Sequence, residues 1–378
     1  MGVKFRDRFD ELHAAASKAI GHDDFGDCDY HAGLRMLLAS VDAGSLNAGK
    51  AALAEHTIVG ILSSRLITQT SWNTHPEWRG RQVDRPLIVI GVPRTGTTAL
   101  HQLLSLDPQF QGIERWLMWG PLARPPRETW QDHPQYLATV AAIEQAHAAA
   151  PEVMAAHGTG ADDMDECLTP MAQSFVSNFF PSMLEVEDYD AWFQQQDEMP
   201  SYRRFANMLR LIGREDDRRW LLKNPSHLFG IEALLKIFPD ACVVQTHRHP
   251  AQAVASLTNL LAGFREMAGG TPVDRDAMQT REIDFWAAAT RRGMAAQDRQ
   301  PKRFVNVLQH ETRANPLGVV ERIYQHFGLD LSDEAERKMR IWAADNPPGG
   351  QSGHAYRPVD SQDYLVESFA PYIEHYDL

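Results

Sequence analysis

The stretch Arg85-Pro-Leu-Ile-Val-Ile-Gly-Val-Pro-Arg-Thr-Gly-Thr-Thr98 decides the fold of this chain. Its first part, 85–90, is a short apolar, β-branched run that ends at Gly91, which is typical of a buried parallel strand. Leucines at helical spacing follow it. A glycine-rich turn between a strand and a helix directs backbone N–H groups and the helix dipole at an anion. The stretch therefore predicts a strand, an anion-binding loop and a helix, in that order.

The pairing of a strand with a helix recurs three times downstream. We expect strands at 219–223, 241–247 and 303–308, followed by helices at 228–238, 251–262 and 316–327. This alternation predicts an α/β fold, with a P-loop-like parallel sheet flanked by helices. Ligand sites in such sheets lie at the carboxyl ends of the strands, so the residues just after the strands are the candidates.

The rest of the chain is expected to be helical and to belong to one domain, 1–378. Helices are expected before the sheet and in a long insertion, with the clearest insertion helix at 137–156. The expected parts are a helical lead-in at 1–80, an α/β core at 85–108 and 216–345, a helical insertion at 109–215, and a C-terminal tail at 346–378.

Composition limits the classes of function. The chain has 378 residues, a formal net charge of −13 and 43% hydrophobic residues, so it is globular and an unlikely partner for nucleic acid. No apolar run approaches the roughly 20 residues of a membrane span, and no secretory signal is visible in 1–10. Cys28, Cys167 and Cys242 lie far apart, in no metal-ligand spacing. We expect a cytoplasmic protein with reduced thiols and no metal.

The loop that follows the first strand is an anion-binding loop of unusual form. Its spacing is similar to a Walker A loop, but Thr97 stands at the position of the Walker lysine, which argues against ATP hydrolysis with Mg²⁺. The basic residue is Arg94 instead, whose fork suits a phosphate or sulfate. We expect Arg94, Thr95, Gly96, Thr97 and Thr98 to bind the anion.

A second anion site is predicted after the third of the expected strands. Arg248 follows that strand, and Ser256 lies about two turns into the next helix, which begins near Pro250. Two anion sites on neighbouring strands of one sheet indicate a nucleotide with two separated phosphate groups.

These residues resemble the sulfotransferases that use 3′-phosphoadenosine-5′-phosphosulfate (PAPS), and the bacterial subgroup above all. The anion loop resembles their 5′-phosphosulfate loop in the arginine form, which tyrosylprotein sulfotransferases also carry. Arg248 and Ser256 match the family's 3′-phosphate pair with its eight-residue separation. Further family-like segments are 220–227, 238–241, 310–316 and 327–329.

The resemblance implies a mechanism. The donor is PAPS, the product is adenosine 3′,5′-bisphosphate (PAP), and no metal is needed because the donor is already activated. Lys223 matches the lysine beside the transferred sulfo group. The family uses a histidine or a glutamate as general base, and four residues stay open for this role: Glu166, His157, Glu114 and His227.

The N-terminal helices and the long insertion are expected to form the acceptor side, and the C-terminal tail at 346–378 is expected to close over the nucleotide. Tyr356 and Arg357, in a glycine- and proline-flanked tail, are candidates for closing over the nucleotide. Apolar side chains favour a hydrophobic small molecule or lipid with a hydroxyl, and a homodimer stays open. The candidate acceptor residues are Trp116, Met118, Trp119, Met164, Met171, Phe175, Phe179 and Trp192.

Two other functions stay open. A P-loop kinase or NTPase would carry a lysine in place of Thr97 and an acidic Mg²⁺ ligand at a strand end, where this chain has Lys223 and Arg248. A non-catalytic protein with the same fold would bind PAP tightly without turnover.

Overall fold

The computed structural model describes residues 4–44, 46–149, 160–346 and 362–378. The chain falls into two compact units, each described by itself below. The first comprises 1–83, 113–217 and 265–271, and the second comprises 84–112, 218–264 and 272–378. That the chain forms one domain stays a prediction.

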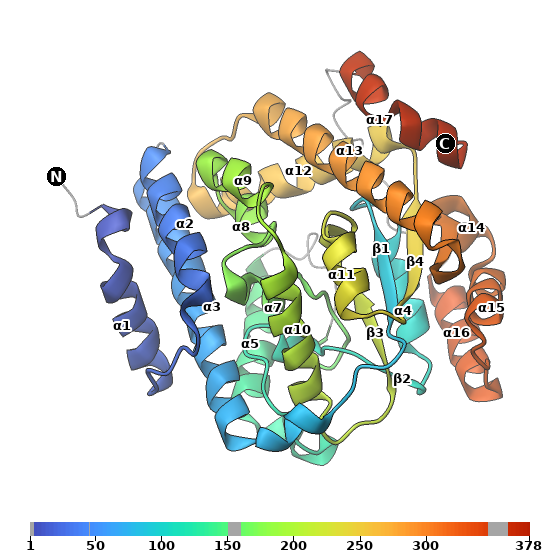
Figure 1. Cartoon of the computed structure of the whole chain (residues 1–378), viewed down its shortest axis with the longest axis horizontal. Helices are drawn as coiled ribbons and strands as arrows, with labels where there is room; N and C mark the ends of the chain where they lie inside the picture. Colours follow the sequence, from blue (N-terminus) through green and yellow to red (C-terminus); the bar gives the residue numbers. More distant parts are fainter. Residues whose placement is uncertain (1–3, 45, 150–159, 347–361) are drawn as a thin grey trace. The chain divides into compact units, whose positions relative to one another are not determined.

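The second unit is built on a parallel sheet, which is drawn as arrows in Figure 1. Within the described residues, five strands follow the order β2-β3-β1-β4-β5, and all four pairings are parallel. The expected α/β fold with a parallel sheet flanked by helices is confirmed. The strands are β1 (Leu87–Gly91), β2 (Phe110–Gln111), β3 (Arg219–Lys223), β4 (Cys242–His247) and β5 (Phe304–Leu308).

The helices of the second unit follow the strands along the chain. One of them, α12, ends in residues that cluster with the first unit. They are α4 (Thr97–Ser105), η7 (Pro225–Leu228), α11 (Ile231–Ile237), α12 (Pro250–Gly269), α13 (Arg275–Arg299), η8 (Pro301–Arg303), α14 (Gln309–Ala314), α15 (Pro316–Phe327), α16 (Asp333–Asp345) and α17 (Gln362–Tyr376).

Most expected elements of the second unit are confirmed, although strand bounds shift by one or two residues and the helices α13 and α16 were not expected. The strand at 219–223 and the helix at 316–327 have the expected bounds. The expected helix at 228–238 is wrong at its start, because the chain forms a 3₁₀ turn that ends at Leu228 before α11 begins. The helix after β4 runs beyond 262 to Gly269. The two-residue strand β2 was not expected, since so short a strand has no detectable periodicity.

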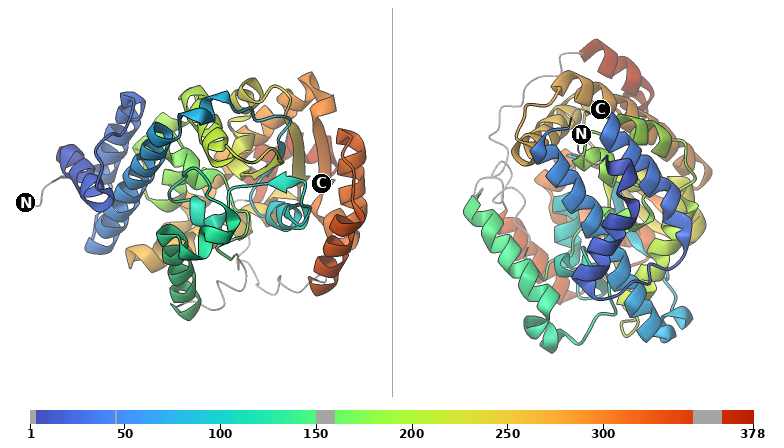
Figure 2. Two further views of the ribbon diagram at one scale, coloured as in Figure 1. Left: turned by 90° about the horizontal axis from the view of Figure 1, so that it is seen from below. Right: turned by 90° about the vertical axis from the view of Figure 1, so that its left-hand side faces the viewer.

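The first unit is helical in its described part, as the sequence predicts. The helices α1 and α3 lie side by side (Figures 1 and 2). Of the expected helix at 137–156, the described part lies in α5, and 150–156 is outside the described residues. The elements are η1 (Phe5–Asp7), α1 (Phe9–Ile20), η2 (Cys28–Tyr30), α2 (His31–Ala43), α3 (Ala48–Thr74), η3 (Pro76–Gly80), η4 (Arg115–Leu117), η5 (Arg127–Asp132), α5 (Pro134–Ala149), α7 (Leu168–Met171), η6 (Ala172–Ser174), α8 (Phe179–Met183), α9 (Glu187–Phe193) and α10 (Met199–Ile212).

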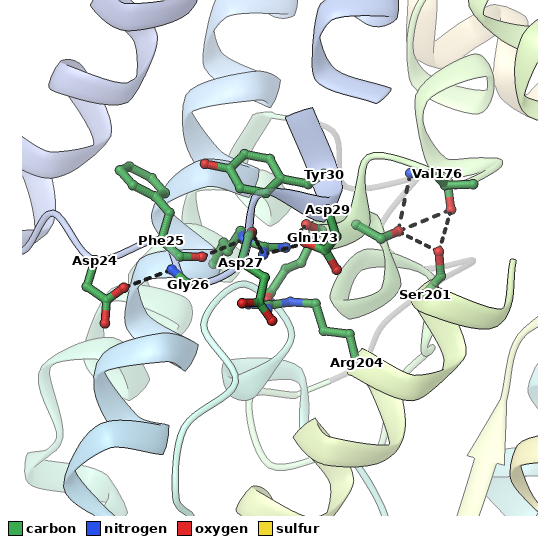
Figure 3. Close-up of polar contacts among 12 residues, drawn as sticks. Asp24, Phe25, Gly26, Asp27, Asp29, Tyr30, Gln173, Val176, Ser201 and Arg204 are labelled. Atoms are coloured by element: carbon green, nitrogen blue, oxygen red, sulfur yellow. Dashed lines mark hydrogen bonds and ion pairs between the residues drawn. The ribbon is translucent and has the colours of Figure 1, made fainter. Parts of the chain in front are cut away.

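A buried polar network ties the helices of the first unit together (Figure 3). Arg65 of α3 is fully buried and donates to the carbonyl oxygens of Phe25, Asp27 and Gln173 at 2.7–3.0 Å, and to the carboxylate of Asp29 at 2.8 Å. Arg204 of α10 donates to the side-chain oxygen of the same Gln173 at 2.9 Å. Since a buried charge is tolerated only when it is hydrogen-bonded, this network fixes the turn that holds residues 25–29 against α3 and α10.

Candidate functional site

The carboxyl ends of three neighbouring strands meet in the second unit. β1 lies between β3 and β4, with Val89 beside Lys223 and Gly91 beside Thr246. The anion loop leaves β1 at this level, while Lys223 ends β3 and Arg248 follows β4. The two predicted anion sites therefore lie at one edge of one sheet, where ligands bind in open α/β folds.

The loop backbone can be formed only with glycine at its first position. Gly91 has a φ of 144°, and a Cβ added there would lie 2.6 Å from both the carbonyl oxygen and the Oγ1 of Thr246. Arg94 and Gly96 also have positive φ angles, of 70° and 96°. Arg94 is not a glycine, so its backbone is strained, and such strain is concentrated at functional sites.

Hydrogen bonds from within the second unit stabilise the strained loop. The Thr95 hydroxyl donates to the carbonyl oxygen of Val92 at 2.7 Å and bonds the Thr246 hydroxyl at 2.6 Å. Thr95 is fully buried, so its hydroxyl holds the loop together and faces away from solvent.

The carbonyl group of Arg94 is a second point of attachment. It accepts hydrogen bonds from Arg248 Nη1 at 3.2 Å and from Gln309 Nε2 at 3.4 Å. Arg248 thus links the loop after β1 to the chain after β4, and Gln309 links the loop to the chain after β5. The strained residue is fixed from two neighbouring strands.

The first backbone N–H groups of helix α4 have no hydrogen-bond partner within the helix. Its first intrahelical bond runs from Leu100 N to Gly96 O at 3.1 Å, and no side chain caps its N-terminus. The N–H groups of Thr97 and Thr98 precede that bond, as the first groups of any helix do. Together with the helix dipole they attract an anion.

The residues expected at the two anion sites contact each other. Arg94 Nε donates to Ser256 Oγ at 2.9 Å, although the sequence assigns Arg94 to the 5′ end and Ser256 to the 3′-phosphate. Arg248 Nε donates to the side-chain oxygen of Gln252 at 2.9 Å, which directs its guanidinium toward the loop. The two expected anion sites are therefore adjacent.

Lys223 lies beside the start of α4. Its side chain is buried, and Nζ lies 3.5 Å from Thr98 Oγ1. His227, four residues later, is fully buried, and burial lowers the pKa of its imidazole to about 3. A general base works best with a pKa near the working pH, so His227 is a weak proton acceptor.

The other candidates for the general base lie in the first unit or outside the described residues. Glu114 is buried and forms an ion pair with Arg124 at 3.1 Å, and Arg124 also pairs with Asp216 at 3.2 Å. Glu166 is half-buried and follows a turn in which its N–H bonds the Asp165 carboxylate at 2.7 Å. His157 lies outside the described residues, as do Tyr356 and Arg357 of the expected nucleotide-closing tail.

The apolar candidates for the acceptor pocket divide into core and surface. Trp119 is exposed, at 48%, whereas four of the others are buried in the core of the first unit. One of these four, Phe175, stacks on Phe180 with ring centroids 5.1 Å apart. The buried four are Trp116, Met171, Phe175 and Phe179.

The sequence analysis did not single out three residues of this site. Thr246 and Gln309 support the loop, and both stand at the carboxyl end of a predicted strand, where the signal was available. The third is His101 of α4, which is buried on the side of the helix that faces β3. A lone histidine in a leucine-rich helix gives no signal until the packing of that helix is known.

The sheet and its helices define this chain as an α/β protein, with Arg94 in the loop after β1 and with Lys223 and Arg248 at the ends of the neighbouring strands. The family model described as "Sulfotransferase family" matches residues 86–333. This match spans both anion sites and most of the chain. The chain belongs to the sulfotransferase family, and the predicted resemblance is confirmed.

Individual relatives support this assignment. The omega-hydroxy-beta-dihydromenaquinone-9 sulfotransferase Stf3 of Mycobacterium bovis is 25% identical over 301 residues, which are 78% of this chain and 73% of that protein. The crystal structure of sulfotransferase STF1 from Mycobacterium tuberculosis H37Rv aligns with a TM-score of 0.87 and 36% identity, over 98% of this chain and 100% of that one. For STF9 from Mycobacterium avium the values are 0.86 and 27%, over 98% and 97%.

The findings extend to some of the other expectations. None of the helices in the described part of the chain has both the length and the apolarity that a bilayer-spanning segment needs. The compartment, the oligomeric state and the individual site residues stay predictions.

Proposed function

We propose that this sulfotransferase takes the sulfuryl group from PAPS and transfers it to a hydroxyl of a hydrophobic small molecule or lipid. One observation carries the proposal: the strained loop after β1, the lysine that ends β3 and the arginine after β4 meet at one edge of the sheet. Three cations so close together in a chain of net charge −13 indicate a ligand with several negative charges.

The residues present fit the two ends of the donor nucleotide. Arg94 and the N–H groups of Thr97 and Thr98 are suited to the 5′-phosphosulfate, because the helix start supplies donors without partners in the helix. Arg248 and Ser256 are suited to the 3′-phosphate. In the described structure Arg94 and Ser256 bond each other, so the proposal includes an exchange of this contact for contacts with the nucleotide.

PAPS supplies a sulfuryl group already activated by its anhydride bond to phosphate. The chain's part is to hold the donor in line with the acceptor and to neutralise charge on the leaving oxygen. We assign the second task to Lys223, whose buried ammonium is an effective point charge in a region of low dielectric constant. We assign proton removal from the acceptor first to Glu166, whose acidic stretch leads into an aromatic run, and keep Glu114 as the alternative.

The acceptor class rests on kinship and composition. Stf3 acts on a hydroxylated dihydromenaquinone, which is a lipid with a hydroxyl. The acidic chain argues against a polyanionic glycan, which needs a basic surface. A lipid or phenolic alcohol fits both facts.

The decisive experiment is calorimetric titration with PAP and, in parallel, with ATP and Mg²⁺. We expect wild type to bind PAP selectively, and Arg248→Ala to lose 10-fold or more in affinity, because a charged hydrogen bond contributes about 1.5–3 kcal/mol. Arg340→Ala is the matched control, since Arg340 is an exposed arginine of α16 whose partner is Glu336. A preference for ATP and Mg²⁺ would favour a kinase, and no nucleotide binding would refute the proposal.

Turnover separates the enzyme from a non-catalytic binding protein. With PAPS labelled in its sulfuryl group, we expect label to move to a hydroxylated isoprenoid quinone or a phenol, and Lys223→Met to slow the transfer at least 10-fold. Glu166→Gln and Glu114→Gln compare the two carboxylates. Tight PAP binding with no transfer to phenols, sterols or lipid alcohols would identify a non-catalytic protein.

A further inference from the structure

A buried histidine of α4 has a ring nitrogen without a partner. His101 is 1% exposed, and its Nε2 atom has no hydrogen bond in the structure. Buried polar atoms are almost always hydrogen-bonded, and the exceptions in native proteins are concentrated at functional sites. The position of His101 shows which group it can serve.

His101 lies next to the lysine that ends β3. On α4, Thr98 and His101 are three residues apart and share one face of the helix, which packs on β3. On β3, Leu221 and Lys223 are two residues apart and share one face of the sheet. Thr98 Oγ1 lies 3.5 Å from Lys223 Nζ, and the His101 ring is hydrogen-bonded to the Leu221 backbone. The pair Thr98 and His101 on α4 therefore lies alongside the pair Lys223 and Leu221 on β3.

The contacts of His101 define its protonation. A hydrogen bond to the backbone of Leu221 raises the pKa of its ring. Burial and the charge of Lys223 outweigh this effect and lower the pKa to about 3. The ring is neutral, so one of its two nitrogens is an acceptor, and Nε2 is the nitrogen without a hydrogen-bond partner.

We propose that His101 is a positioning residue, whose Nε2 accepts a hydrogen bond from the Lys223 ammonium and aims it, together with Thr98, at the leaving oxygen. The ammonium has three donors, so Thr98, His101 and an oxygen of the donor can all be served at once. The role in transfer rests on the proposed function, whereas the contact itself does not. If His101 served only to pack α4, its Nε2 atom would make no hydrogen bond with Lys223.

The contact is tested by nitrogen NMR on the full chain labelled with ¹⁵N-histidine. His101→Gln assigns the His101 signals by their loss. We expect a neutral ring whose Nε2 resonance moves in Lys223→Met and stays in place in Lys236→Met, a matched change at an exposed lysine of α11. A His101 signal that ignores Lys223→Met, or a ring protonated at pH 7, overturns the proposal.

The role is tested by kinetics with sulfuryl-labelled PAPS, measured as release of labelled sulfate to water. We expect His101→Leu to lower the rate 10-fold or more with PAP affinity unchanged, and His101→Gln, which keeps an acceptor, to recover part of the loss. In the Lys223→Met background, His101→Leu should cost nothing further. Equal losses in both backgrounds would refute positioning through Lys223. Absence of PAP binding by wild type would instead refute the proposed function, and the NMR result would still decide the contact.

Discussion

Gly91→Ala should destabilise the second unit and remove its anion loop. The new Cβ would lie 2.6 Å from two atoms of Thr246 and 3.0 Å from Thr95 Oγ1, closer than real Cβ contacts. Overpacking of this kind costs about 1–3 kcal/mol, and a side chain at a φ of 144° adds about 1–3 kcal/mol. The expected loss is thus about 2–6 kcal/mol, a large part of the 5–15 kcal/mol that stabilises a typical domain.

The assay is urea denaturation at pH 7, followed by PAP titration of the folded protein. Gly263→Ala is the matched control: it lies inside α12, nothing lies within 4 Å of its added Cβ, and it should gain about 1 kcal/mol from helix propensity. We expect Gly91→Ala to be destabilised and to bind PAP poorly even where it is folded. If it lost less than about 1 kcal/mol and bound PAP normally, the argument from Thr246 would be refuted.

Three further outcomes are expected. Arg65→Met, which removes four hydrogen bonds from a fully buried guanidinium, should lower the free energy of unfolding by about 3 kcal/mol or more in urea, and a loss below about 1 kcal/mol would contradict the network. Tyr372→Phe, which removes the bond between α17 and His247, should cost about 1 kcal/mol by the same measurement, with an unchanged value as the contrary result. Burial lowers the folded pKa of His247 to about 4 and those of His101 and His227 to about 3, below the unfolded value near 6.5, so the unfolded chain binds protons first; stability should be full above about pH 6.5 and fall on acidification by up to about 1.4 kcal/mol per pH unit for each histidine, and a stability that rose from pH 7 to 5 would refute this.

The sheet could be predicted because its strands are buried on both faces. The run 87–91 is apolar at nearly every position, and 242–244 opens the next strand with an apolar triplet, so the type of these elements is visible even though their bounds shift by one or two residues. The strand β2 could not be seen, since two residues pair with 219–220 only because the loop before them brings them there. The break before α11 was also missed. It lies at Gly230, a single glycine within a pattern that is otherwise helical.

The proposed nucleotide-binding residues could be chosen from local chemistry, whereas the contacts that these residues make with one another could not. A loop after a strand reveals Arg94 and the threonines, because their backbone and side-chain types suit an anion directly. The bond between Thr95 and Thr246 joins residues 151 positions apart, so no local pattern reveals that the Thr95 hydroxyl also supports the loop. Likewise His101 acquires a meaning only through α4 packing on β3.

The general base stays the open part of the site because a carboxylate's basicity depends on its partner. In the sequence, Glu166 lies in an acidic stretch that leads into an aromatic run, whereas Glu114 follows the anion-loop helix and directly precedes Arg115. In the structure, Arg124 lies ten residues after Glu114 and forms ion pairs with both Glu114 and Asp216. This ion pair gives Glu114 a structural task in the first unit. Glu166→Gln and Glu114→Gln are therefore to be compared side by side, since the pairing of Glu114 with Arg124 could not be predicted from spacing in the sequence.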